Sequence, residues 1–345
     1  MPYAVRSFAP ILFVTALATA CAPTSADLER DARHNVRNEI TTQLTTLESA
    51  ARDLQAAAPV PDADGWNATR DADAVARMRT AWGRMRVAYE HVEGAIAVLF
   101  PELDRSIDAR YDDFIATRAD TNLFDDDGVT GMHAVERILW SDTIPARVAA
   151  FESGLPGYVA AAFPASQSDA AGFRDRLVQR MIDDAVQLRT QFGTVRELDS
   201  ATAFRGVIGS MEEQVEKVDK AATSEEESRY AQYTLADMRA NLDGARGTFE
   251  AFRAWLVSTE GGPAIAGQID ARFDALEARY AMLTGDSLPP VPGGYNPDAP
   301  SEEDAATPYG SLRAALVHES DPDHSGSVVS LLNQAATAMG IPVLP

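Results

Sequence analysis

The chain has 345 residues, a formal net charge of −22 at pH 7 and a single cysteine. The strong negative charge argues against nucleic acid and anionic lipid surfaces as partners, because both attract positively charged proteins. The single cysteine excludes an intrachain disulfide, so packing must stabilise the fold, and a chain of this length can bury a large core.

The first twenty residues have the features of an export signal. Arg6 supplies a positive charge, residues 11–17 form a short apolar run, and small residues then lead into Cys21. The run is shorter than the roughly 20 residues that a membrane-spanning helix needs. We therefore expect residues 1–20 to be a lipoprotein signal peptide and residues 21–27 to be a tether lipidated at Cys21. The alternative is an ordinary signal peptide that leaves a free thiol.

The rest of the sequence has helical periodicity and no convincing alternating strand pattern, which predicts an all-α fold. Long amphipathic helices joined by short loops are typical of antiparallel helical bundles. We expect helices at 27–58, at 72–99, in a short segment containing Ile107 and Phe114, from about Gly131, and at 145–163, 169–197, 204–222, 227–258, 264–284, 301–318 and 326–339.

One short sequence occurs twice. Residues 107–114 read IDARYDDF and residues 269–276 read IDARFDAL, with five identical positions. Such an echo indicates an internal duplication. We therefore expect one helical domain over residues 28–340, composed of two related bundles in the approximate halves 28–165 and 166–340.

The strongest candidate for chemistry is the segment from Gly131 to Trp140. His133 and Glu136 are three residues apart, so on a helix they share one face and can converge on one ion. Trp140 continues that face, which indicates that it is turned toward protein rather than water. A buried imidazole and carboxylate need partners, and these can be a metal ion or, alternatively, polar groups on other helices.

A second set of acidic residues precedes this segment. Glu90 and Glu93 lie three residues apart beside an apolar helical seam. Carboxylates on facing helices build metal sites in bundles, and crowded like charges need a cation or protons to neutralise them. Further aspartates follow at intervals of four beyond a break at Pro101, namely Asp104, Asp108 and Asp112. The alternative is a solvated acidic edge paired with Arg86, Arg105 and Arg110.

Several motifs together resemble imelysin-like proteins, closest to the EfeO/EfeM type of bacterial iron-uptake component, over residues 28–340. The motifs are Tyr89-Glu-His-Val-Glu93, Phe100-Pro-Glu-Leu-Asp104, Gly131-x-His133-x-x-Glu136 and the stretch 229–245. The resemblance implies two duplicated helical bundles. It also implies a metal site at His133 and Glu136, with Glu90, Glu93 and Asp108 as accompanying acids.

Two features depart from the family pattern. Ala231 and Gln232 stand where iron-uptake members often have a serine–histidine pair. The N-terminal cupredoxin-like domain of some members is not expected in this chain. The metal site is therefore expected to be kept, whereas the partnership with a permease stays open.

These observations predict an exported lipoprotein on the periplasmic side that binds a metal ion, with iron expected, as part of iron uptake. Carboxylate and imidazole ligands also fit zinc, manganese or calcium. The expected partners are an iron permease, a peroxidase and the membrane that holds the lipid. Ala22, in place of an aspartate after the cysteine, favours the outer membrane.

Two other functions remain open at this point. The first is a cell-surface module that binds a polysaccharide or a protein, with a structural acidic cluster. The second is a metallopeptidase, because the family is classed with peptidases. No general base or zinc-protease motif is recognisable in the sequence, so we expect no enzymatic activity.

Overall fold

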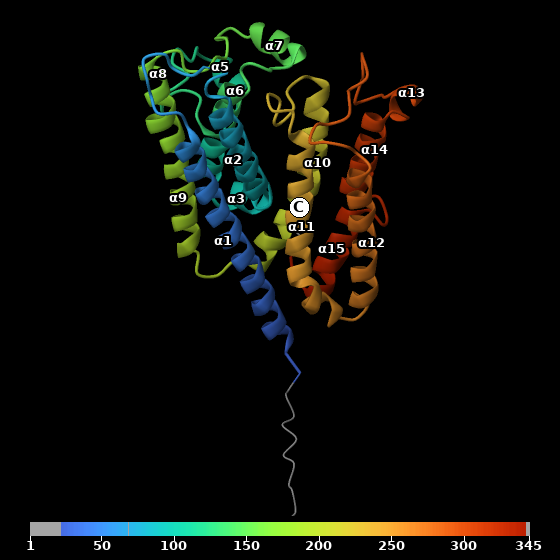
Figure 1. The fold of residues 1–345 in the computed structure, drawn as a ribbon. Coiled ribbons are helices and arrows are strands. Elements are labelled where there is room, and N and C mark those ends of the chain that lie inside the picture. Colours follow the sequence, from blue (N-terminus) through green and yellow to red (C-terminus); the bar gives the residue numbers. More distant parts are fainter. Residues whose placement is uncertain (1–21, 68, 343–345) are drawn as a thin grey trace, which may run out of the picture.

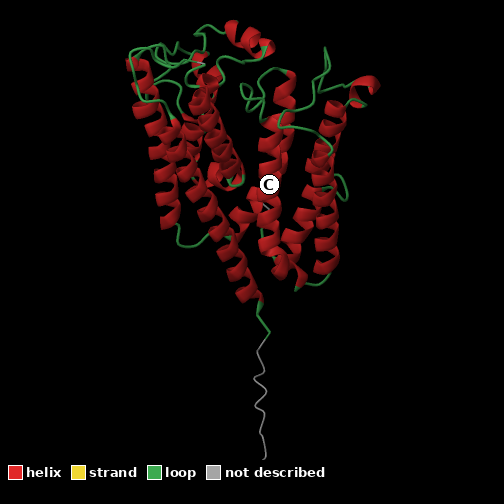
Figure 2. Cartoon of the chain, in the orientation of Figure 1, coloured by secondary structure: helices red, strands yellow, loops and turns green. Residues whose placement is uncertain are grey.

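The structure, a computed structural model, describes residues 22–67 and 69–342. The predicted signal peptide and Cys21 lie outside this part of the chain. Within it, every regular element is a helix and no strand occurs (Figure 2). The all-α prediction is confirmed. None of the helices in the described ranges is long and apolar enough to cross a membrane.

The helices form two groups that lie side by side (Figure 1). The first group comprises α1 (Ser25–Ala57), α2 (Ala72–Glu90), α3 (Glu93–Leu99), α4 (Pro101–Ile107), α5 (Tyr111–Ile115), α6 (Gly131–Leu139), α7 (Ala146–Ser153), α8 (Gln167–Gly172), the π-helix η1 (Phe173–Leu177) and α9 (Val178–Thr194). The second comprises α10 (Ser200–Ala222), α11 (Thr234–Val257), α12 (Gly262–Ala281), α13 (Glu302–Ala305), α14 (Pro308–Ser320) and α15 (Val328–Met339).

The long helix α1 shows how the apolar pattern builds the core. Its side chains at spacings of three and four are buried, from Val36 through Ile40, Leu44 and Leu47 to Leu54. This stripe packs against α2 and α9 of the first group and against α11 of the second. The two groups also meet where α2 packs on α11 and α3 packs on α10. The helices therefore share one continuous apolar core.

The predicted helix 72–99 is wrong in one respect, because it is two helices separated at His91 and Val92. α11 crosses the chain at this break. A Cβ atom at Gly244 would lie only 2.2 Å from the carbonyl oxygen of His91, so the two backbones touch there. The break places Glu90 at the end of α2 and Glu93 at the start of α3.

Two other predicted helices are too long. The helix expected at 145–163 ends at Ser153, shortly before Pro156 and Gly157. The helix expected at 227–258 begins only at Thr234. Residues 223–233 form a compact loop instead, hereafter the 223–233 loop. A left-handed backbone at Ser224 (φ 70°) and Gln232 (φ 54°) is incompatible with a continuous helix.

The spatial division between the groups falls after Thr194. α8, η1 and α9 follow the boundary expected near residue 165, yet α9 packs on α1, α4 and α6. The repeated sequence differs in local structure between its two copies. Ile107 ends α4, and the chain restarts as α5 at Tyr111, whereas residues 269–276 lie inside α12. The internal duplication therefore remains a prediction.

Candidate metal centre

Gly131 fixes the position of the candidate site. Its φ angle is +83°, a left-handed conformation that L side chains rarely adopt. A Cβ atom there would lie 2.4 Å from the carbonyl oxygen of Ile107 and 2.6 Å from that of Ser106. Glycine therefore lets the first residue of α6 rest directly on the end of α4. The next residue of the chain after α4 is Asp108, which is thereby brought beside His133.

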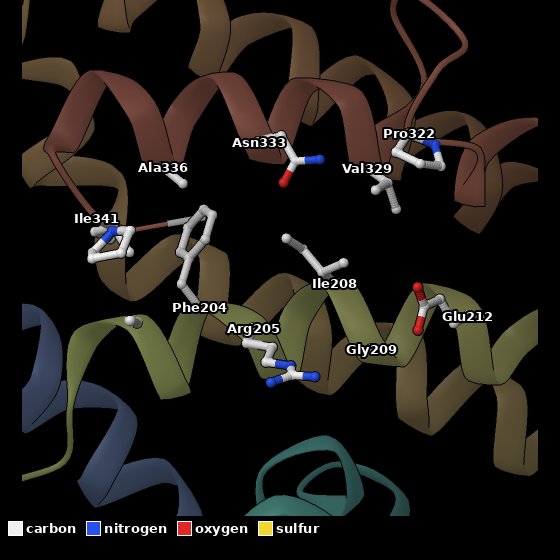
Figure 3. A pocket seen from close by; sticks show the side chains of 12 residues that line it. Phe204, Arg205, Ile208, Gly209, Glu212, Pro322, Val329, Asn333, Ala336 and Ile341 are labelled. Carbon is white, nitrogen blue, oxygen red and sulfur yellow. The ribbon is translucent and has the colours of Figure 1, made fainter. Parts of the chain in front are cut away.

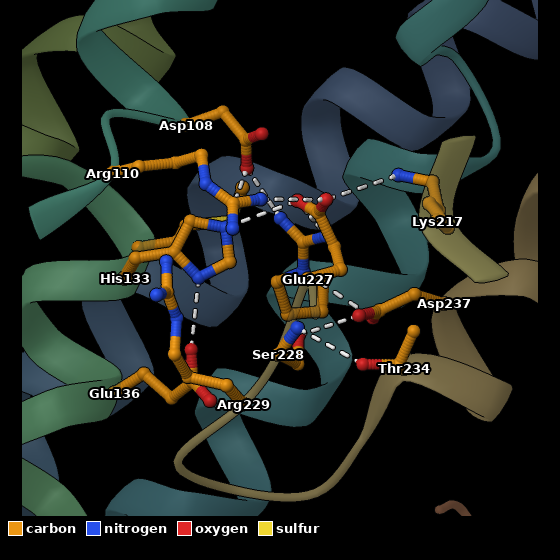
Figure 4. A network of polar contacts seen from close by, with 12 residues as sticks. Asp108, Arg110, His133, Glu136, Lys217, Glu227, Ser228, Arg229, Thr234 and Asp237 are labelled. Atoms are coloured by element: carbon orange, nitrogen blue, oxygen red, sulfur yellow. Dashed lines mark hydrogen bonds and ion pairs between the residues drawn. The ribbon is translucent and has the colours of Figure 1, made fainter. Parts of the chain in front are cut away.

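The imidazole of His133 converges with two carboxylates (Figure 4). Its Nε2 atom lies 3.3 Å from Oδ1 of Asp108 and 3.1 Å from Oε1 of Glu227. One ligand atom from each of the three residues lies within 4.8 Å of the others, close enough to share a metal ion. His133 and Glu227 are buried, whereas the side chain of Asp108 keeps 17% of its surface exposed. Asp108 is therefore the most exposed residue of the three.

Glu136 contacts the other ring nitrogen of the same imidazole. Its Oε2 atom lies 2.8 Å from Nδ1 of His133. Its Oε1 atom accepts hydrogen bonds from the backbone N–H groups of Tyr230 (2.9 Å) and Ala231 (2.8 Å). Because an ionised carboxylate can only accept, Nδ1 carries the proton of this contact, and Nε2 is the ring nitrogen that faces Asp108 and Glu227. A carboxylate that orients a histidine in this way is a common support of metal sites.

Glu227 was not among the residues predicted from the sequence. It lies in the 223–233 loop, of which residues 227–233 were expected to be helical, and it is 94 positions from His133 in the sequence. The loop is held by a hydrogen bond from the Ser228 hydroxyl to Asp237 and by one from the Ser228 N–H to Thr234. The only sequence signal near Glu227 is the resemblance of residues 229–245, which begins two residues later.

Glu90 and Glu93 take part in a different set of contacts. Oε1 of Glu90 accepts hydrogen bonds from Arg86 and from Lys217, the latter at 3.2 Å. Oε2 of Glu93 accepts from Lys217 (3.1 Å) and from Asn241 (3.4 Å). Oε2 of Glu90 is buried without a hydrogen-bond partner. Both carboxylates lie around the buried ammonium rather than on His133.

The remaining acidic positions have separate partners. Asp104 accepts a hydrogen bond from the hydroxyl of Tyr89, and Asp112 pairs with Arg229. Burial raises the pKa of Asp104 to about 6, although the Tyr89 hydrogen bond opposes this. Neither belongs to the group formed by Asp108, His133 and Glu227. Arg86 pairs with Asp108, so the acidic edge is balanced in part by arginine, as the alternative interpretation expected.

The charged side chains of this group shift one another's pKa values. Burial alone would lower the pKa of the His133 imidazole, but the surrounding carboxylates, Asp108 foremost, raise it well above its ordinary value. Burial would raise the pKa of Glu227, but the positive charges of Lys217, His133 and Arg86 hold it well below its ordinary value. A metal ion needs an unprotonated ring nitrogen. It would therefore replace the proton on Nε2.

The donor set fits a metal ion. Two carboxylate oxygens and one imidazole nitrogen suit iron, manganese or zinc without selecting one of them. Each ligand comes from a different segment: Asp108 from the end of α4, His133 from α6 and Glu227 from the 223–233 loop. The site therefore lies at the junction of the two helix groups.

A separate cavity of about 380 Å³ lies between α10 and α15 (Figure 3). Phe204, Ile208 and Val329 give it a largely apolar wall, and Arg205 and Glu212 lie along its α10 side. None of its lining residues belongs to the candidate metal centre.

Comparison with known proteins identifies the family. The imelysin family model matches residues 40–317. The iron uptake system component EfeO of Yersinia pseudotuberculosis serotype I (strain IP32953) is 29% identical over 214 residues, which are 61% of this chain and 46% of the relative. The protein of the same name from Escherichia coli (strain K12) is 26% identical with the same coverage. The chain thus spans less than half the length of these relatives. It belongs to the imelysin family, as its sequence motifs predicted.

Proposed function

We propose that this protein binds iron at Asp108, His133 and Glu227 and serves in iron uptake. The observation that carries the proposal is the convergence of a buried imidazole nitrogen with two carboxylates on one point. The names of its relatives support the choice of ion, because they are components of an iron uptake system. Iron is here the cargo of the protein, so reversible binding is the activity to be explained.

The surroundings of the three ligands suit capture and release. Asp108 is the partly exposed member, so an ion would arrive from its side and meet the buried His133 and Glu227 last. Carboxylates outnumber arginine and lysine side chains in this region, which favours cations over anions. Arg86 contacts both Asp108 and Glu227 and competes for their oxygens, which moderates the affinity.

In this proposal the other sequence-derived residues act around the ion rather than on it. Glu136 fixes the orientation and tautomer of His133, because both of its oxygens are already engaged. Glu90 and Glu93 add negative charge beside the site and are held by Lys217.

We also propose that the protein is exported and anchored through a lipid on Cys21, and that it passes iron to a permease with the help of a peroxidase. The support is the composition of residues 1–20 and the family resemblance. Metabolic labelling with a palmitate analogue tests the anchor. Label on the natural protein and none on Cys21→Ala is expected, whereas equal labelling of both would rule the anchor out.

Calorimetric titration with Fe²⁺ under anaerobic conditions tests the metal site. We expect His133→Ala to bind at least tenfold more weakly than the natural protein, a loss of about 1.4 kcal/mol or more. His34→Ala is the matched control, because His34 is an exposed histidine on α1. Circular dichroism establishes that both variants are folded. Equal affinity of His133→Ala and the natural protein would remove the proposed site.

A further inference from the structure

Lys217 is an unusual residue in this sequence. It is one of two lysines, the other being Lys220, while arginine supplies nearly all the positive charge. Its side chain, which comes from α10, is fully buried at 0% exposure. A buried ammonium is costly unless it is paired, so its surroundings must be arranged to receive it.

The ammonium is surrounded by carboxylate oxygens. Its Nζ atom lies 3.1 Å from Glu93, 3.2 Å from Glu90, 3.6 Å from Glu213 and 3.9 Å from Glu227. These side chains come from α3, α2, α10 and the 223–233 loop, so the cluster spans the junction of the two helix groups. A small point charge enclosed by oxygens from several segments is the arrangement in which proteins also hold hard metal ions.

One carboxylate oxygen in the same cluster has no hydrogen-bond partner. Oε2 of Glu90 is buried and has no hydrogen-bond partner, although its sister oxygen receives both Arg86 and Lys217. Without the ammonium, the carboxylates of Glu90, Glu93 and Glu213 would repel one another. A cation from solution could then bind between them, with the free oxygen of Glu90 as an additional ligand.

We propose that Lys217 is a tethered counter-cation that occupies the position of a second metal ion. Its ammonium is the shared ion-pair partner of Glu90, Glu93 and Glu213. It thereby limits the protein to the one ion held by Asp108, His133 and Glu227. Lys217 thus sets the number of metal ions that each protein molecule binds. This role rests on the proposed function of the neighbouring site. Arginine does not serve equally well, because its planar fork is larger than the compact ammonium.

The test is the number of bound ions in Lys217→Met. The protein is dialysed to equilibrium against Mn²⁺, and bound metal is counted by mass spectrometry of the metal. We expect one ion in the natural protein and two in Lys217→Met. Lys220→Met is the matched control, because Lys220 lies on the same helix, is partly exposed and pairs with Glu216. It should still bind one ion.

A double variant separates the two sites. His133→Ala alone should bind no ion, whereas His133→Ala combined with Lys217→Met should bind one. If His133→Ala binds as the natural protein does, the proposed function fails, and the gain of an ion in Lys217→Met still decides the role of Lys217. One ion in both the natural protein and Lys217→Met would overturn the role of Lys217.

If Lys217→Met is unfolded without metal, its circular dichroism is measured with and without Mn²⁺. Mn²⁺ should then restore its helical circular dichroism, because the ion takes the place of the missing ammonium. A variant that stays unfolded at millimolar Mn²⁺ would contradict the proposal.

Discussion

At the scale of single residues, the candidate site depends on what each carboxylate touches. Glu136 shares the histidine face that the sequence predicts, yet its oxygens are engaged by Nδ1 of His133 and by two backbone N–H groups. Its role is therefore to position the ring. Glu227 contacts the ligand nitrogen directly although no spacing rule points to it.

Replacing Glu136 with Gln tests this positioning role. The amide oxygen can still accept the N–H groups of Tyr230 and Ala231, but the amide N–H₂ now faces Nδ1 of His133. Nδ1 must then accept, so the variant loses the neutral tautomer that keeps its proton on Nδ1 and leaves Nε2 free for the metal. We expect the affinity for Fe²⁺ to fall by about 10–100-fold. Titration calorimetry measures this.

The control for this change is Glu102→Gln, because Glu102 is an exposed glutamate on α4. It should bind as the natural protein does. Unchanged affinity in Glu136→Gln would show that the tautomer of His133 does not matter for binding.

At the scale of elements, the ends of helices position the residues of the candidate site. The start of α6 rests on the end of α4 through Gly131, and this contact joins His133 to Asp108. The break between α2 and α3 turns Glu90 and Glu93 toward Lys217. The 223–233 loop carries Glu227 from the second helix group.

Gly131→Ala tests the contact between α6 and α4. The new Cβ atom would overlap the carbonyl oxygen of Ile107, and the left-handed backbone would be strained. We expect the free energy of unfolding to fall by about 2–4 kcal/mol, measured by urea denaturation with circular dichroism.

Gly267→Ala is the matched control for Gly131→Ala. Gly267 lies inside α12, and nothing lies within 4 Å of the position that its Cβ would take. Alanine there should stabilise the protein by about 0.5–1 kcal/mol, since it is the better helix former. Equal effects of the two substitutions would show that the close contact at Gly131 is unimportant.

The difference between sequence and structure has a physical origin in these elements. Helical spacing reports a local preference, so the all-α fold and the core face of α1 could be predicted. The break at His91 depends on the approach of Gly244, which is distant in sequence. The 223–233 loop depends on left-handed residues that are not glycine, namely Ser224 and Gln232. Neither feature leaves a local pattern.

At the scale of the whole molecule, part of the strong negative charge lies at the candidate site. Most of the negative charge can remain solvated on the surface, but a fraction of the acids is buried where the two helix groups meet. Arg86, Lys217 and His133 pair with those acids. The sequence predicts that His133 belongs to the site and that acidic residues lie near it. It could not predict that a fixed ammonium lies among them, because that pairing exists only in the folded chain.

An anomalous-scattering map from a crystal of the iron-loaded protein, collected at the iron absorption edge, tests the proposed iron site most directly. One strong peak is expected in contact with Asp108, Nε2 of His133 and Glu227, and no peak is expected among Glu90, Glu93 and Glu213. A peak located elsewhere, or an iron-loaded crystal with no peak at His133, would contradict it.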